Sequence, residues 1–316
     1  MASICFMLPS AVLMILFAYG VTMMGDLHQA GWLHGLRLAA VAVVAQAVWG
    51  MGKKLCPDPT RIILALIAAI FVILNSNSIG QVAAIAGGAV AGWLIYRRKD
   101  KSEVENFAAI NSSKHHFWAA GCLILYAALL ISLPTLAGSS KAKSLHVFDS
   151  FYRAGSLVFG GGHVVLPLLR AEVVPPGWIS DDAFLAGYGA AQAVPGPLFT
   201  FAAYLGTILH GRPHAWLGGI GCLLTIFLPA WLLVGGALPF WHLLLRKTWA
   251  KGAMRGANAA VVGILFAALC NPLWTETVSR LSDVALVLVA FICLQFWRTS
   301  AWLVVALAAA AGQWLL

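Results

Sequence analysis

The sequence predicts an all-α, polytopic integral membrane protein of about 9–11 helical segments, some of them broken, and three observations lead to this fold class. Hydrophobic residues make up 61% of the 316 residues and charged residues only 10%, whereas charged residues are about 25% of a typical soluble domain. The mean hydropathy is +0.88. Apolar stretches recur along the whole chain, many near the roughly 20 residues that span a bilayer core. This composition excludes an ordinary water-soluble protein.

The expected helical segments follow from these apolar stretches in chain order. They lie near residues 4–24, 33–52, 61–75, 79–96, 117–137, 148–170, 183–211, 213–241, 252–271, 281–297 and 300–316. The first segment has no basic region before it and carries Pro9 inside its apolar run, so we expect a retained helix rather than a signal peptide. Several of the others are too short or too interrupted to cross a bilayer alone, which favours broken or re-entrant helices.

The one long polar stretch, RRKDKSEVENFAAINSSKHH, covers residues 97–116 and divides the chain into two apolar parts. Its basic residues are Arg97, Arg98, Lys99, Lys101 and Lys114. Loops rich in Lys and Arg stay on the cytoplasmic side of a membrane. We therefore expect a cytoplasmic linker here, and we attribute the net charge of +9 to such loops rather than to a nucleic-acid partner.

The two apolar parts repeat a pattern. FMLPSAVLM at 6–14 is similar to IFLPAWLLV at 226–234, and GLRLAAVAVVAQA from Gly35 is similar to GANAAVVGILFAA from Gly256. Two short apolar segments follow in each part. The matching order and spacing predict two homologous repeats. Their boundaries would be 1–96 for the rear helices of a first repeat, 97–116 for the linker, and 117–316 for a second repeat with a preceding helix.

A run of three glycines interrupts the apolar stretch LVFGGGHVVLPLL at residues 157–169. Gly160, Gly161 and Gly162 each disfavour a helix interior by roughly 1 kcal/mol relative to Ala. A broken membrane helix exposes backbone N–H groups at a positive helix end, which suits an anion. The alternative is that the glycines allow close helix packing. His163 beside them is either a packing residue or a group for proton coupling or oxyanion contact.

The second break is expected in AAQAVPGPLFTF at residues 190–201. Pro195, Gly196 and Pro197 cannot continue an α-helix, because each proline lacks an N–H group and pushes the residue before it away from the α region. Gln192 lies one turn before this break and Thr200 one turn after it. Both can donate hydrogen bonds to an oxyanion without adding charge; the alternative for each is a bond between helices.

Among the arginines, Arg37 is the strongest candidate for an anion pathway, because apolar residues surround it in HGLRLAAVAVV. It occupies the repeat position that Asn258 fills in the second part. Charges inside a membrane usually serve a pathway, although a snorkelling position near the helix start is the alternative. Arg153, Arg170 and Arg255 lie near segment ends, where snorkelling is the default.

Other chemistry has no sequence signal. The six cysteines are scattered through apolar sequence, with no CxxC pair and no histidine at ligand spacing, so neither a disulfide framework nor a metal site is indicated. No nucleotide-binding loop and no nucleophile with a base is recognisable, so we expect no cofactor and no enzymatic activity.

The stretch FGGGHVVLPLL followed by QAVPGPLFTFAAYLG resembles the second half of the chromate ion transporter (CHR) family, and FLPA and GANAAVVG continue the likeness. The resemblance covers about 145–316, and more weakly 1–96 as the rear part of the first CHR repeat. It implies two homologous halves of opposite membrane orientation. The family's motif positions are Phe159, Gly160, Gly161, Gly162, His163, Gln192, Pro195, Gly196, Pro197 and Thr200. The first part lacks its own glycine and Pro-Gly-Pro motifs.

The resemblance implies a multi-pass transporter in the plasma (inner) membrane of a bacterium that exports chromate, driven by membrane potential or ion coupling. Sulfate has the same shape and charge, so a sulfate-type oxyanion permease is an alternative. The other alternative is a non-transporting or partner-dependent membrane subunit. The partners expected are chromate or a similar oxyanion, the lipid bilayer, and a homodimer mate or a complementary CHR half, with no nucleic acid.

Overall fold

The computed structural model describes residues 2–24, 31–75, 78–96, 113–140, 142–158, 164–194, 196–211, 213–237 and 248–315. Every regular element among these residues is a helix, which confirms the all-α fold class. The Phe159–His163 motif and Pro195 lie outside the described residues, as does most of the expected linker. The helix after the linker begins at Ser113, so its first four residues fall within the expected linker.

The helices of the first part, up to the linker, are α1 (Ala2–Met24), α2 (Gly31–Leu55), α3 (Pro59–Leu74) and α4 (Ser78–Tyr96). Those that follow the linker are α5 (Ser113–Ser139), α6 (Lys143–Ser156), α7 (Val165–Val173), α8 (Asp181–Ala193), the 3-10 turn η2 (Leu198–Thr200) and α9 (Phe201–His210). The chain then continues through α10 (Ala215–Ala237), α12 (Thr248–Ala268), η4 (Leu269–Trp274), α13 (Thr275–Thr277), α14 (Leu281–Gln295) and α15 (Ala301–Leu315).

Five helical stretches among the described residues are long and apolar enough to cross a membrane. They are Gly31–Leu55, Ile79–Tyr96, Phe117–Ser139, Ala215–Ala237 and Trp249–Thr277. Shorter apolar helices accompany them, including Pro59–Leu74 and Leu281–Gln295. Many large apolar side chains of these helices point outward, as with Ile124 on α5, which is 68% exposed. Such outer faces suit a hydrocarbon surrounding, so the chain is a multi-pass membrane protein.

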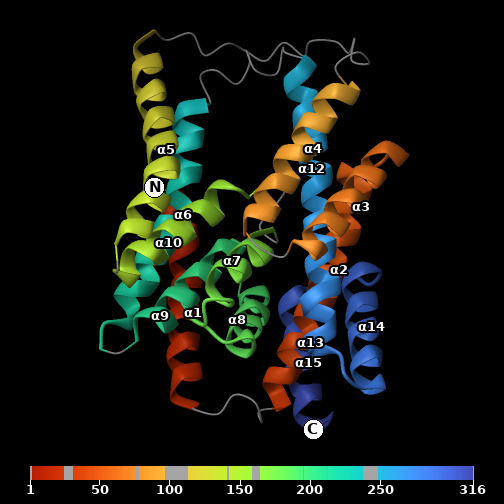
Figure 1. Cartoon of the computed structure of the whole chain (residues 1–316). Helices are drawn as coiled ribbons and strands as arrows, with labels where there is room; N and C mark the ends of the chain where they lie inside the picture. Colours follow the sequence, from red (N-terminus) through yellow and green to blue (C-terminus); the bar gives the residue numbers. More distant parts are fainter. Residues whose placement is uncertain are drawn as a thin grey trace.

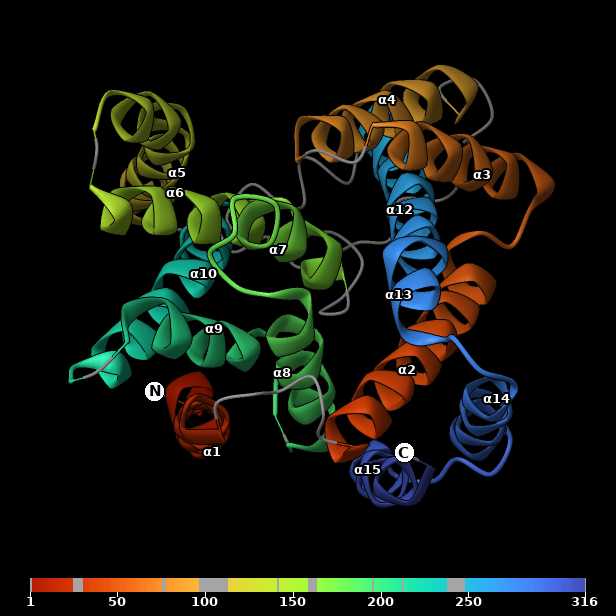
Figure 2. The ribbon, with the colours of Figure 1, turned by 60° about the horizontal axis from the view of Figure 1, so that its bottom comes forward.

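Two helical hairpins pack reciprocally across the molecule. The α3–α4 hairpin packs against α12, and the α14–α15 hairpin packs against α2. Figure 2 shows α3 and α4 beside α12 and, at the opposite end of α2, α14 and α15 beside that helix. Corresponding helices also run in opposite directions: in Figure 1, α1 descends where α10 ascends, and α4 ends at the top where α15 ends at the bottom.

Small residues make these helix contacts possible. A Cβ added at Gly88 on α4 would lie 2.8 Å from the carbonyl oxygen of Gly256 on α12. A Cβ added at Gly31 on α2 would lie 2.7 Å from the carbonyl oxygen of Gly312 on α15. Because lipid gives no hydrophobic drive between helices, close backbone approach through small residues is the usual source of their association.

The helices α8 and α9 pack against helices from before the linker and from after it. α8 packs against α1, α2 and α15, and α9 packs against α1 and α10. α6 lies against α5 and α10, and α7 follows it toward α4 and α12 (Figure 2). Two of the expected segments, 148–170 and 183–211, are therefore each divided into two helices, so the interruptions predicted there are confirmed.

Candidate functional site

The break between α8 and α9 is an irregular segment in which Gly196 is exposed, Val194 and Pro197 are half-buried and Thr200 is buried. α8 ends at Ala193, Val194 has extended backbone angles, and the chain returns to a helical conformation only at η2. Gly196 has φ +152°, a conformation that residues with a side chain rarely adopt. A helix cannot continue through Pro197, because proline lacks a backbone N–H donor, and glycine tolerates the backbone conformation found at position 196.

Gly196 touches helix α1. A Cβ added at Gly196 would overlap the Ser10 hydroxyl oxygen and lie 2.9 Å from the Ser10 Cβ. Ser10 is fully buried and directly follows Pro9, the proline inside α1. Ser10 was not among the site residues predicted from the sequence. The available signal was its position after a proline within an apolar helix.

Two polar side chains flank this break. The Thr200 hydroxyl is buried and donates to the carbonyl oxygen of Pro197 at 2.9 Å. It therefore holds the turn, and a bound anion would have to compete for its proton. Gln192 is half-buried, one turn from the hydroxyl of Tyr188 with which it interacts. The structure thus brings Gln192, Gly196, Pro197 and Thr200 together in one segment.

The first backbone N–H groups of η2 add to these side chains, whereas the N–H groups of Thr200 and Phe201 already donate to the carbonyl oxygens of Pro197 and of η2. Helices leave their first N–H groups without an intrahelical acceptor, and these groups carry the positive end of the helix dipole. Here that end follows directly on Pro197. The segment therefore offers neutral donors without a formal charge, which can bind an anion and release it again.

The first break, after α6, adjoins the other helix that contains the repeated proline. α6 ends at Ser156, and α7 begins at Val165. A Cβ added at Gly155 would overlap the carbonyl oxygen of Ile226 on α10 and lie 3.0 Å from the Pro229 ring. Each break therefore lies next to a helix that contains a proline. The break after α6 lies next to α10, and the break after α8 lies next to α1.

Arg37 does not lie with the break residues. Its guanidinium pairs with the Asp182 carboxylate at 2.6 Å, and both side chains are about 15% exposed. Asp182 is in the first turn of α8, and the ten residues from there to Gln192 correspond to roughly 15 Å along the helix. Arg37 therefore fastens α2 to the start of α8. Asp182 could not be predicted as its partner, because the two residues are distant along the chain.

The other arginines are also occupied. Arg153 bonds Asp149 at 2.6 Å and Glu172 at 3.1 Å. Arg170 bonds Asp181 at 2.7 Å and Glu276 at 3.0 Å. The guanidinium of Arg255 lies 5.5 Å from the centre of the Tyr96 ring. These arginines, which we expect to snorkel, contact carboxylates or an aromatic ring.

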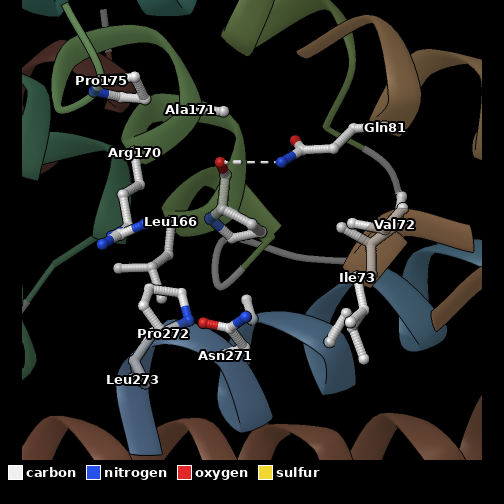
Figure 3. A pocket seen from close by; sticks show the side chains of 14 residues that line it. Val72, Ile73, Gln81, Leu166, Arg170, Ala171, Pro175, Asn271, Pro272 and Leu273 are labelled. Atoms are coloured by element: carbon white, nitrogen blue, oxygen red, sulfur yellow. Dashed lines mark hydrogen bonds between the residues drawn. The ribbon is translucent and has the colours of Figure 1, made fainter. Parts of the chain in front are cut away.

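A cavity of ≈ 90 Å³ lies where α3, α4, α7 and the end of α12 meet (Figure 3). Gln81 of α4 is buried and donates through Nε2 to the carbonyl oxygen of Pro167 at 3.2 Å. Its Oε1 has no hydrogen-bond partner among the described residues. Asn271 lines the cavity from the α12 side, where its side chain is seen below Gln81. The volume has room for several water-sized groups.

This cavity is lined both by residues from before the linker and by residues of α7, the helix that follows the glycine run. Gln81 and Asn271 were not among the site residues predicted from the sequence. Gln81 lies at the start of an apolar stretch, and Asn271 precedes a proline, so a signal was present in both cases. The hydrogen bond between Gln81 and Pro167 spans 86 positions along the chain and depends on the tertiary fold.

Comparison with known proteins places the chain among membrane transporters. The family model described as "Chromate transporter" matches residues 1–93 and 145–313. A chromate transport protein of Pseudomonas aeruginosa is 26% identical over 271 residues, which are 84% of this chain and 61% of that protein. A probable chromate transport protein of Synechococcus elongatus is 23% identical over 274 residues, 83% of this chain and 64% of that protein.

A shorter relative matches one part of the chain. The uncharacterized transporter YwrB of Bacillus subtilis is 33% identical over 165 residues, which are 51% of this chain and 81% of that protein. The chain thus spans less than two thirds of the length of the two longer relatives. No solved structure matches it.

Proposed function

The chain belongs to the chromate transporter family, and from this premise we propose that it carries chromate outward across the plasma membrane of a bacterium. The observation that supports a route is the helix break between α8 and α9, which lies within the matched residues and against Ser10 of α1. The family is one of transporters, and the proposal involves movement of an intact anion without covalent chemistry.

In this proposal the two broken segments form the anion pathway. The residues are Phe159, Gly160, Gly161, Gly162, His163, Gln192, Pro195, Gly196, Pro197 and Thr200. Broken membrane helices point their N-terminal N–H groups at anionic substrates, and transporter sites of this kind lie near the bilayer midplane. Arg37 acts in positioning, because its ion pair with Asp182 holds the first turn of α8 against α2.

We also propose that residues 1–96 and 117–316 are inverted repeats. The support is the reciprocal packing of the α3–α4 and α14–α15 hairpins and the opposite directions of corresponding helices. In transporters built of such repeats, one repeat moves relative to the other so that the binding site opens first to one side of the membrane and then to the other.

The membrane potential is sufficient to drive this transport. Chromate is a dianion, and a potential of about 100 mV, negative inside, moves two charges outward with roughly 4.6 kcal/mol. Coupling to another ion is a further source. Sulfate presents the same tetrahedral shape and charge to neutral donors, so a sulfate-type oxyanion is the alternative substrate.

A partner-dependent subunit is the second candidate function. The observation that favours it is the match to YwrB. The 165 matched residues are 51% of this chain but 81% of that protein. Relatives built of one such part would need a second part to complete a pathway. In this alternative the chain transports only as a homodimer or with a complementary half.

Chromate accumulation in a sensitive bacterial host tests the proposal. We expect cells that express the chain to retain less chromate and to grow at higher chromate concentrations than cells with an empty vector. Co-expression with a complementary half distinguishes the alternative, because only a partner-dependent subunit would gain export from it. Unchanged accumulation in both cases, with the protein present in the membrane, would contradict transport of chromate.

A further inference from the structure

A second hollow, unrelated to the two breaks, lies on the outer side of α2, α3 and α12. It measures ≈ 360 Å³, a size typical of sites for small ligands. Val48 and Gly52 of α2 form one wall, Ile62 and Leu66 of α3 another, and Phe266 of α12 a third. Ile62, Leu66 and Phe266 are 47%, 49% and 39% exposed, so the groove opens outward.

The groove exists because glycine stands where a side chain would fill it. A Cβ added at Gly52 would meet nothing within 4 Å, although Gly52 lines the groove. On the opposite side, Gly263 lets α12 approach the backbone of α3 closely at Ala65. The helices therefore touch at the back of the groove and diverge at its front.

Lys53 lines one end of this apolar groove, and Lys54 is the next residue of α2. Lys53 and Lys54 form the last turn of α2, and both are exposed. The Lys53 ammonium lies 4.7 Å from the centre of the Trp49 ring. Within the described part of the chain, neither lysine takes part in an ion pair. Trp beside Lys at the end of a membrane helix is typical of the level of the lipid headgroups.

Neighbouring charges do not cancel those of the lysines. The Asp58 carboxylate, in the connection between α2 and α3, is committed to Arg61 through Nε at 2.5 Å and the backbone N–H at 2.9 Å. Although partial burial favours its protonated form, these bonds from Arg61 and one from the Tyr96 hydroxyl hold the pKa of Asp58 below its usual value. The mouth of the groove therefore remains positively charged.

The same contacts tell which end of the molecule this is. The Tyr96 hydroxyl at the end of α4 donates to Asp58 at 3.1 Å, so the end of α2 lies at the end of the molecule from which the basic stretch 97–101 continues. By the rule that basic loops stay inside, this is the cytoplasmic side. Anionic lipids there attract basic residues next to the membrane.

We propose that this groove binds one anionic phospholipid, with an acyl chain between α2, α3 and α12 and the phosphate at Lys53 and Lys54. An acyl chain matches the apolar lining, and the phosphate matches the two ammonium groups. The bound lipid would fasten the α3–α4 hairpin to α2 and α12.

The test compares lipid binding by the purified full-length chain and two matched glycine variants. Gly52→Leu places a side chain in the groove, whereas Gly50→Leu adds the same side chain two positions away, where a Cβ also meets nothing within 4 Å. Native mass spectrometry in detergent would measure phosphatidylglycerol and phosphatidylcholine separately. We expect the wild-type chain and Gly50→Leu to retain one phosphatidylglycerol and Gly52→Leu to lose it.

A second variant separates the headgroup from the acyl chain. Replacing both Lys53 and Lys54 by Gln should weaken phosphatidylglycerol binding about 30-fold, the change expected from two basic residues beside an anionic lipid. Phosphatidylcholine binding should change little. Inorganic phosphate alone should not compete, because it lacks the acyl chain. Equal binding of both lipids by the wild-type chain, or retained binding by Gly52→Leu, would overturn the proposal.

Discussion

At the scale of single residues, the contact between Gly196 and Ser10 is the most restrictive feature of the candidate pathway. Gly196 combines φ +152° with a neighbour that leaves no space for a Cβ. Either property alone would select glycine. Together they fix the position of the break relative to α1, so that any change there moves the start of α9.

We expect Gly196→Ala to reduce chromate export strongly while the protein still enters the membrane. The strained backbone angle costs about 1–3 kcal/mol, and the overlap with Ser10 adds to it. Gly211→Ala is the matched control, because Gly211 also has a positive φ, +64°, but open space around it. Export at the wild-type rate by Gly196→Ala would show that this contact is not part of the pathway.

The ion pair between Arg37 and Asp182 allows a second prediction at this scale. Arg37→Gln removes the guanidinium from a partly buried carboxylate, which should destabilise the protein by up to about 3 kcal/mol. The double variant Arg37→Gln with Asp182→Asn should recover both thermal stability and export. A double variant that is stable but does not export would show that Arg37 acts in the anion pathway itself and not only in positioning α8.

At the scale of elements, proline and glycine determine where helices end and where they touch. The break at 195–197 could be predicted from the sequence, because the missing donors of two prolines are a local property. Two contacts could not be predicted from the sequence: the ion pair of Arg37 with Asp182 and the hydrogen bond of Gln81 to Pro167. These partners come together only through the packing of α2, α4, α7 and α8.

Helix packing gives a third prediction. Gly88→Leu on α4 should lower the midpoint of thermal unfolding, because a Cβ there would already lie 2.6 Å from the Ala260 Cβ on α12. Overpacking of this kind costs typically about 1–3 kcal/mol. The adjacent Gly87→Leu is the control, since a Cβ at Gly87 meets nothing within 4 Å. Equal midpoints for the two variants would contradict the close approach of α4 and α12.

At the scale of the whole molecule, the sequence pattern predicted the class of fold and the order of corresponding helices. It did not indicate that each hairpin packs on the helix of the other part, because periodicity describes one segment at a time. The reciprocal arrangement in Figure 2 is a property of the tertiary structure. The ends of α2 and α4 lie close together, where the Tyr96 hydroxyl donates to Asp58, and from the basic stretch after Tyr96 we expect both ends to face the cytoplasm.

Orientation can be checked by labelling single cysteines in a variant without the six native ones. A cysteine at position 105, in the basic linker, should react with a membrane-impermeant reagent only after permeabilisation. A cysteine in place of Pro213, which is exposed in the turn between α9 and α10, should react in intact cells. That turn lies beside the C-terminal half of α1, where Tyr19 accepts from the N–H of Trp216. The reverse pattern would invert the assigned orientation.

The most direct test of the proposed transport is chromate uptake by inside-out membrane vesicles under an imposed potential. Export from cells becomes uptake in such vesicles, and a positive interior should draw the dianion in. We predict uptake that rises with the potential, is reduced by excess sulfate, persists in Gly211→Ala and is lost in Gly196→Ala. Uptake no greater than in vesicles without the protein, at any potential, would contradict the proposal that this chain exports chromate.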